Sequence, residues 1–138
     1  MNRLMVASII LLAGISGEAM AACTAPATQV TGTALTTLIS GRTVCATQGT
    51  DKWQEQHQVG GTLSDYKKGP TDPVDPTKQV GNWSIDTVAN TVKYVYTGGP
   101  GYTYSVYNDG GTYSFCTAPG GSVVVSGATF QTAANCPP

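Results

Sequence analysis

Short runs of β-forming residues, separated by glycine-containing turn signals, are the feature of this sequence that most restricts its fold. The turn signals include Gly60-Gly61, Gly98-Gly99 and Asp109-Gly110, and the runs between and around them are KWQEQHQV, TLSDYK, VKYVY, YTYSVY and TYSFC. Glycine tolerates the positive φ angles of tight hairpin turns. Many short strands at close intervals are typical of an all-β barrel or sandwich. We therefore predict an all-β fold, an antiparallel meander that forms a small barrel or a strongly curved sheet.

The beginning of the chain predicts a secretory signal peptide. Arg3 precedes an apolar run from Leu4 to Ile15, and a small-residue stretch containing Ala19-Met20-Ala21 follows, as in a cleavable export signal. The run is shorter than the roughly 20 apolar residues that a membrane-spanning helix needs. We predict that residues 1–21 are removed and that residues 22–138 form a single all-β domain, periplasmic or secreted.

Four cysteines, Cys23, Cys45, Cys116 and Cys136, predict two disulfides in an exported chain of this size. Spacing alone allows three pairings. We favour the local one, Cys23–Cys45 and Cys116–Cys136, because each bond would pin a chain terminus to a strand. Zinc is disfavoured because no C-x-x-C pair is present. A lipid anchor on Cys23 is disfavoured because it would leave an odd number of cysteines.

Charge and composition exclude several functional classes. The chain carries seven Lys or Arg residues and eight Asp or Glu residues, for a net charge of −1, so it lacks the basic patch of nucleic-acid-binding proteins. The sequence contains no basic amphipathic helix of the kind that attaches a protein to a membrane surface. We expect a monomer with no cofactor, no nucleic-acid partner and no membrane span. Its partner would be a small molecule, a glycan or a protein.

Two segments interrupt the strand pattern. Residues 33–40, TALTTLIS, predict a short helix that Gly41 ends. Residues 70–76 carry a proline at every third position, and proline lacks the N–H that a sheet ladder needs. This stretch predicts an extended connector between a strand ending near Lys67 and one beginning near Val80. It can serve as a strap across one barrel end or as a lid.

The turn at Gly60-Gly61 predicts which side chains of the first hairpin share a face. A two-residue turn pairs His57 with Ser64 and Glu55 with Tyr66. Because side chains alternate between faces, one side then carries Trp53, Glu55, His57, Val59, Ser64 and Tyr66, and the other, expected to be solvated, carries Gln54, Gln56, Gln58, Leu63, Asp65 and Lys67. We predict that four residues of the first side bind a ligand: Trp53, Glu55, His57 and Tyr66.

The same register brings Ser64, His57 and Glu55 together, the residue types of a hydrolase triad. The serine lies in mid-strand without the G-x-S-x-G elbow that exposes a nucleophile. We therefore predict no catalytic residue and no enzymatic activity.

A metal site is also disfavoured. Asp65, Asp72 and Asp75 offer oxygen ligands, but their spacing is not that of a calcium loop. His57 is the only histidine. We expect no bound metal.

A second set of hairpins separates an apolar face from a tyrosine-bearing one. Counting outward from the turns places Val95, Tyr102, Tyr104, Val106, Tyr113 and Phe115 in the core. The opposite face carries Tyr94, Tyr96 and Tyr107 among Ser and Thr residues. Exposed tyrosines can stack on sugars or anchor a protein, and we predict them as ligand-binding residues. Alternatively, another segment such as residues 122–130 covers this face.

The run VGNWSI, followed by the hairpins VKYVY, YTYSVY and TYSFC, resembles the small exported calycin or lipocalin-like proteins of bacteria. The shared motif is Gly81-x-Trp83, which opens the first strand in lipocalins and lies in a middle strand here. The resemblance implies a barrel that binds a small apolar molecule or blocks an enzyme through its rim loops. It also implies that Trp83 plugs the closed end.

These features together predict a small exported non-enzymatic binding protein, a ligand-binding or enzyme-inhibitor-type barrel. The alternative is an extracellular structural or adhesive subunit, because a Thr-, Gly- and Tyr-rich surface of low charge favours self-association through strand edges. A hydrolase ranks behind both.

Overall fold

The computed structural model describes residues 23–48, 51–68, 78–119, 121–132 and 136. The predicted signal peptide and the proline-rich connector lie outside these residues, as do Asp72 and Asp75. The strands on either side of the connector end at Lys68 and begin at Lys78, close to the positions predicted for them.

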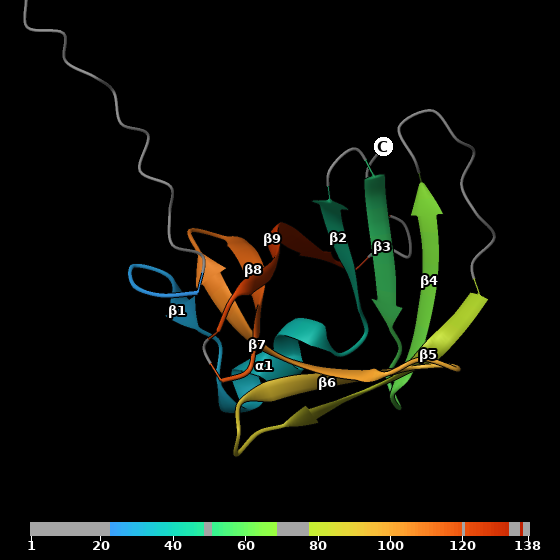
Figure 1. Ribbon diagram of the computed structural model, residues 1–138, viewed down its shortest axis with the longest axis horizontal. Helices are drawn as coiled ribbons and strands as arrows, with labels where there is room; N and C mark the ends of the chain where they lie inside the picture. The colour runs from blue at the N-terminus through green and yellow to red at the C-terminus, as the bar shows by residue number, and fades with distance from the viewer. Residues whose placement is uncertain (1–22, 49–50, 69–77, 120, 133–135, 137–138) are drawn as a thin grey trace, which may run out of the picture.

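The described residues form one helix and nine strands (Figure 1). The elements are β1 (Thr28–Gln29), α1 (Gly32–Ile39), β2 (Arg42–Gln48), β3 (Asp51–His57), β4 (Thr62–Lys68), β5 (Lys78–Asp86), β6 (Thr91–Tyr96), β7 (Gly101–Asp109), β8 (Thr112–Thr117) and β9 (Val123–Gln131). Each strand from β2 to β9 pairs antiparallel with the next, and β9 pairs back with β2. These eight strands therefore close into a barrel. The predicted all-β antiparallel barrel is confirmed.

Helix α1 covers one end of the barrel, called here the helix end (Figure 1). Leu35 and Ile39 lie one turn apart on the same helix face and are fully buried in the core. The backbone N–H of Gly32 donates to Oδ1 of Asn90 at 2.7 Å, so the turn between β5 and β6 caps the helix. Ser40 and Gly41, which has φ +70°, then lead the chain into β2. The predicted helix and its glycine stop are confirmed.

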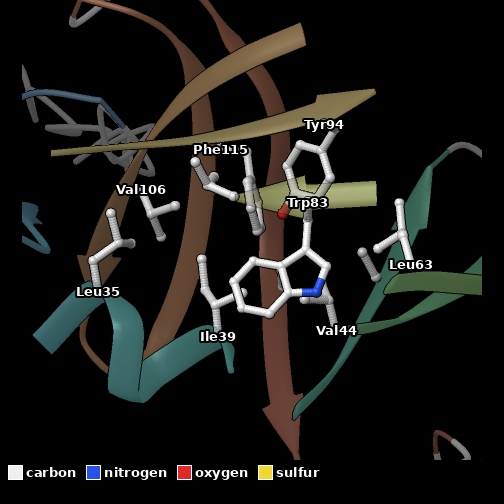
Figure 2. Packing of buried hydrophobic residues seen from close by; sticks show 11 residues of the cluster. Leu35, Ile39, Val44, Leu63, Trp83, Tyr94, Val106 and Phe115 are labelled. Atoms are coloured by element: carbon white, nitrogen blue, oxygen red, sulfur yellow. The ribbon is translucent and has the colours of Figure 1, made fainter. Parts of the chain in front are cut away.

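The core fills the barrel interior at this end. In Figure 2 the Trp83 indole lies beside Ile39, with Val106 and Phe115 nearby. The indole N–H donates to the carbonyl of Gln58 at 3.1 Å, which satisfies its one polar atom. Trp83 therefore helps the helix to fill the interior at the helix end.

The predicted face of β7 and β8 is confirmed. Val106 is fully buried, Phe115 is 4% exposed, and Tyr104 lies against Phe115 with ring centroids 6.3 Å apart. Val106 and Phe115 are partners in the ladder, so their side chains point to the same, inner face. Tyr102 and Tyr113 lie on the same inner face, because side chains two residues apart on a strand point to the same side.

The predicted face of β6 was wrong. Val95 is 44% exposed, and Tyr94, expected outside, is 3% exposed and belongs to the core. In the ladder Val95 pairs with Gly101, the first residue of β7, so the turn between β6 and β7 ends before Gly101. This register turns Tyr94 and Tyr96 inward and leaves Lys93 in solvent.

The predicted register of β3 and β4 was also wrong, by one residue. His57 pairs with Leu63 and Glu55 pairs with Asp65. The backbone N–H of Gln58 donates to the carbonyl of Thr62, so the loop has one residue more than a two-residue turn at Gly60-Gly61. As a result Leu63 enters the core and Ser64 faces outward.

The favoured disulfide pairing was wrong as well. Cys23 is bonded to Cys116 and Cys45 to Cys136, with Cα–Cα distances of 6.1 and 5.7 Å. The first bond connects Cys23, which precedes β1, to β8 across 93 residues, and the second connects Cys136, which follows β9, to β2 across 91 residues. The backbone N–H of Cys136 also donates to Oε1 of Gln54 at 2.7 Å. Gln54, expected in solvent, is therefore buried beneath Cys136.

Candidate ligand-binding site

The barrel interior away from the helix is lined by tyrosines. Tyr94 and Tyr96 come from β6, Tyr102 and Tyr104 come from β7, and we call these four the tyrosine cluster. They face inward because Val92, on the same side of β6, is fully buried and pairs with Tyr104. The exposed fraction rises from 3% at Tyr94 to 43% at Tyr102. The cluster therefore extends from the core to solvent at the end of the barrel opposite α1, which we call the far end.

The four rings form two nearly parallel pairs. Tyr94 and Tyr96 have centroids 6.3 Å apart and planes 19° apart, and Tyr102 and Tyr104 have centroids 6.2 Å apart and planes 5° apart. The two pairs meet at a steep angle, because Tyr96 and Tyr102 lie edge to face at 66° with centroids 6.0 Å apart. The strands thus present two aromatic walls that are steeply inclined to each other.

Glu55 of β3 brings a carboxylate to these walls from across the barrel. The phenol of Tyr96 donates to Oε1 of Glu55 at 2.6 Å, a short charge-assisted hydrogen bond. Asp65 is the ladder partner of Glu55 on β4 and shares its inward face. Two acidic residues therefore accompany the tyrosine cluster.

Three phenols of the cluster, those of Tyr94, Tyr96 and Tyr104, have a raised pKa and are neutral hydrogen-bond donors at physiological pH. Burial, followed by the negative charge of Glu55, raises the pKa of Tyr96 well above its ordinary value. Burial is also the main cause of the raised pKa of Tyr94 and of Tyr104, and the Glu55 carboxylate adds to both shifts. A carboxylate that acts on three phenols lies close to the cluster as a whole.

His57 joins the tyrosine cluster to the core. Its Nδ1 lies 3.2 Å from the backbone carbonyl of Glu55, and its Nε2 lies 2.9 Å from the phenol of Tyr94. A carbonyl only accepts, so Nδ1–H donates to it and Nε2 accepts from Tyr94. Burial lowers the pKa of His57 to about 4, which keeps the ring neutral at pH 7. Both ring nitrogens thus serve the structure.

The candidate hydrolase triad is not assembled. Ser64 alternates with Leu63 and lies on the outer face of β4, whereas His57 and Glu55 lie on the inner face of β3. The Ser64 hydroxyl accepts from Nε2 of Gln58 at 3.0 Å. The prediction that these three residues share a face was wrong, because it depended on the two-residue turn.

Three other predicted ligand-binding residues fall outside the cluster or outside its description. The backbone register places Trp53 opposite Lys67, in the same alternation as Glu55, and Tyr66 opposite Gln54, in the other. The predicted pairing of Glu55 with Tyr66 was therefore wrong. Tyr107 lies on the outer face, half-buried, where β7 pairs with Gln29 of β1. Predictions of binding by the side chains of Trp53 and Tyr66 concern groups that the structure does not describe.

A hollow lies near the helix end, where the start of β2, the end of β3 and the residue after β9 come together. It has a volume of about 200 Å³, and its lining residues are Gly41, Arg42, Thr43, Gln56, His57, Gln58 and Thr132. Its lining contains an arginine and no carboxylate. Its electrostatic character is therefore opposite to that of the tyrosine cluster.

The fold and the site define a small antiparallel barrel with two disulfides and an aromatic, acidic interior at one end. No protein-family model matches the chain, and no curated protein or solved structure shows significant similarity to it. Within the described ranges, no helix is long and apolar enough to cross a membrane. The same ranges contain no group of three or more His, Cys, Asp or Glu residues that could hold a metal ion.

Proposed function

We propose that this chain is an exported protein that binds a small molecule without transforming it, and that the ligand enters the far end of the barrel. The observation that carries the proposal is the gradient of exposure along the tyrosine cluster, from 3% at Tyr94 to 43% at Tyr102. An eight-stranded barrel has an interior that is either filled by side chains or large enough for one small ligand. Here the helix end is filled, and the far end presents ring surface and phenol groups to solvent.

Interior tyrosines favour a small molecule over a large partner. The expectation that a glycan or a protein binds exposed tyrosines depended on an outer tyrosine face, and the register turns Tyr94 and Tyr96 of that face inward. A ligand that contacts them has to enter the barrel. Tyrosine suits such a role because it combines a large apolar surface with a polar tip.

The absence of catalysis is part of the proposal. His57, the natural candidate for a general base, has both ring nitrogens hydrogen bonded and a pKa of about 4. Ser64 lies on the other side of the barrel wall. These positions support binding as the whole of the activity.

Export is proposed from the leader sequence and the disulfides. Stable disulfides are typical of the periplasm and the extracellular space. Cys23 is bonded to Cys116, so its sulfur is not available for a lipid thioether. This supports a periplasmic or secreted protein over a lipid-anchored one.

Closure of the barrel weighs against the structural or adhesive alternative. Self-association by strand addition needs an exposed strand edge, and each strand from β2 to β9 pairs on both sides. We expect the purified protein to elute as a monomer in gel filtration at all concentrations tested. Concentration-dependent oligomers or fibres would favour the structural alternative.

Ligand screening with matched variants tests the proposal directly. A library of small molecules is screened by ligand-observed NMR against the protein, a Tyr102→Ala variant and a Tyr107→Ala variant. Tyr102 lies in the cluster and Tyr107 on the outer face. The affinity of the compounds that bind should therefore fall about tenfold in Tyr102→Ala and stay unchanged in Tyr107→Ala. If no compound binds, or if only Tyr107→Ala weakens binding, the proposal is wrong.

A further inference from the structure

We propose that the ligand carries a positively charged amine or quaternary ammonium group, held against the solvent-facing rings of the tyrosine cluster and beside Glu55. This inference rests on the proposed function and names the chemistry of its site. The site combines an anionic side chain and several aromatic rings, the two groups that attract an organic cation most strongly inside a protein.

The carboxylate is the first part of the argument. Oε1 of Glu55 accepts from Tyr96 at 2.6 Å, so the charge of Glu55 is held against the ring cluster. Asp65 stands opposite Glu55 in the ladder and adds a second negative charge to the same interior. An entering anion would be repelled by both charges, and a neutral ligand would gain from them only through hydrogen-bond donors. A cation would gain from both, because their field is only partly screened inside a barrel.

The rings are the second part of the argument. Cations are attracted to the faces of aromatic rings when they lie within roughly 6 Å of the ring centroid. Centroids in the cluster lie 6.0 Å apart for Tyr96 and Tyr102 and 5.9 Å apart for Tyr94 and Tyr104. Four centroids at such spacings allow one ammonium group to lie close to more than one ring. Because Tyr96 and Tyr102 touch edge to face, the ammonium group would lie over the solvent-facing side of the rings and not between them.

An organic cation fits better than a bare metal ion. Calcium and magnesium need six or more oxygen ligands at short distances, and the described residues offer no cluster of three potential ligands. Phenol rings supply ring faces instead of ligand oxygens. The aromatic walls therefore select a cation with an apolar surface.

A lysine lies at this end of the barrel. The backbone register places Lys78 of β5 opposite Asp65 of β4, and its side chain is exposed. A cationic ligand has to bind despite this charge, so removing it should strengthen binding.

The test compares choline with its neutral isostere 3,3-dimethylbutan-1-ol by isothermal titration calorimetry at low salt. The two probes differ mainly in charge. We expect choline to bind at least about tenfold more tightly than the isostere. Equal affinities, or failure of choline to bind, would overturn the inference.

Variants then locate the charge that recognises the cation. Glu55→Gln keeps an oxygen that can accept from Tyr96 and removes only the charge, so choline affinity should fall about tenfold while isostere affinity is unchanged. Asp109→Asn is the matched control, because it removes a negative charge at the opposite end of β7. An equal loss with Asp109→Asn would show a general charge effect and overturn the inference.

A second variant keeps the test valid if Glu55→Gln does not fold, which thermal unfolding would reveal. Lys78→Gln should strengthen choline binding by about threefold. Weaker choline binding in this variant would overturn the inference.

The inference and the proposed function can fail separately. Tyr102-dependent binding of neutral compounds without a preference for choline would overturn the inference and leave the proposed function standing. Absence of binding by every compound screened would remove both.

Discussion

The two halves of the barrel interior are built from different residues and expose them differently. At the helix end Leu35, Ile39 and Val106 are fully buried aliphatic side chains. At the far end Tyr96, Tyr102 and Glu55 are partly exposed and carry polar atoms. The strands that form the two halves are the same, so the difference lies in the side chains that each strand directs inward.

This difference indicates which half of the interior stabilises the fold and which half is available to bind a ligand. Closely packed aliphatic groups contribute most when water is fully excluded, and any loss of volume there leaves a cavity. Half-exposed tyrosines contribute less to stability, and their uncovered surface can be covered by a ligand. We therefore expect substitutions in the helix half to act on folding and substitutions in the far half to act on binding.

The largest expected effect is that of Leu35→Ala in the helix half. This side chain is fully buried, and a buried leucine reduced to alanine loses about 3 kcal/mol of unfolding free energy. Tyr102→Ala, in the far half, should lose less than about 1 kcal/mol because the ring is half exposed. Urea denaturation followed by tryptophan fluorescence measures both. If Tyr102→Ala costs as much as Leu35→Ala, the two halves do not differ as proposed.

Gly81→Ala should affect both halves at once. A Cβ at this position would collide with the backbone carbonyl of Val95 and lie 2.9 Å from the Cα of Tyr96. Strands β5 and β6 would have to separate, at a cost of about 2 kcal/mol or more, and Tyr96 would move with β6. Denaturant unfolding and ligand titration should therefore both change. Gly101→Ala is the control, because its nearest contact would be 3.4 Å; similar losses in both variants would rule out the steric cause.

Acidification should destabilise the protein through His57, which lies between the two halves. Burial lowers the pKa of His57 from 6.5 to about 4, so the unfolded chain takes up this proton more readily than the folded one. The contribution is present above pH 6.5 and is lost as the pH falls toward 4. Between pH 7 and pH 5 the unfolding free energy should fall by about 2 kcal/mol from this group.

Urea unfolding at a series of pH values measures this dependence. A His57→Gln variant is the control, since it has no ring to protonate and should lose that part of the pH dependence. An identical pH profile in the variant would show that His57 is not the titrating group.

The strand meander, the short helix and the inner face of β7 and β8 were predictable because each depends on local signals. Alternation of Tyr102, Tyr104 and Val106 and of Tyr113 and Phe115 assigns that face without knowledge of the partner strand. The disulfide pairing was not predictable in the same way, because sequence spacing does not report which strands a closed barrel brings together.

The faces of β3, β4 and β6 depended on turn lengths that glycine-rich sequences leave ambiguous. One extra loop residue before Thr62 exchanges the faces of β4 relative to β3. A neglected signal was available in β6, where an inward Val95 would bring Lys93 inward too. A lysine is rarely buried without a partner, so Val92, Tyr94 and Tyr96 were the better inner face. In β4 the apolar side chain of Leu63 was the corresponding signal.

The smallest expected effect concerns the hydrogen bond that connects the tyrosine cluster to Glu55. Tyr96→Phe removes the hydroxyl that donates to Glu55 at 2.6 Å and should lower the unfolding free energy by about 1 kcal/mol, because the pair is only partly buried. Tyr102→Phe removes an equivalent hydroxyl from a ring that is 43% exposed and should change stability by less than about 0.5 kcal/mol. Thermal unfolding of the two variants side by side gives the difference. Equal losses would mean that the Glu55 contact adds nothing beyond ring packing, and the far half would then owe its order to the tyrosines alone.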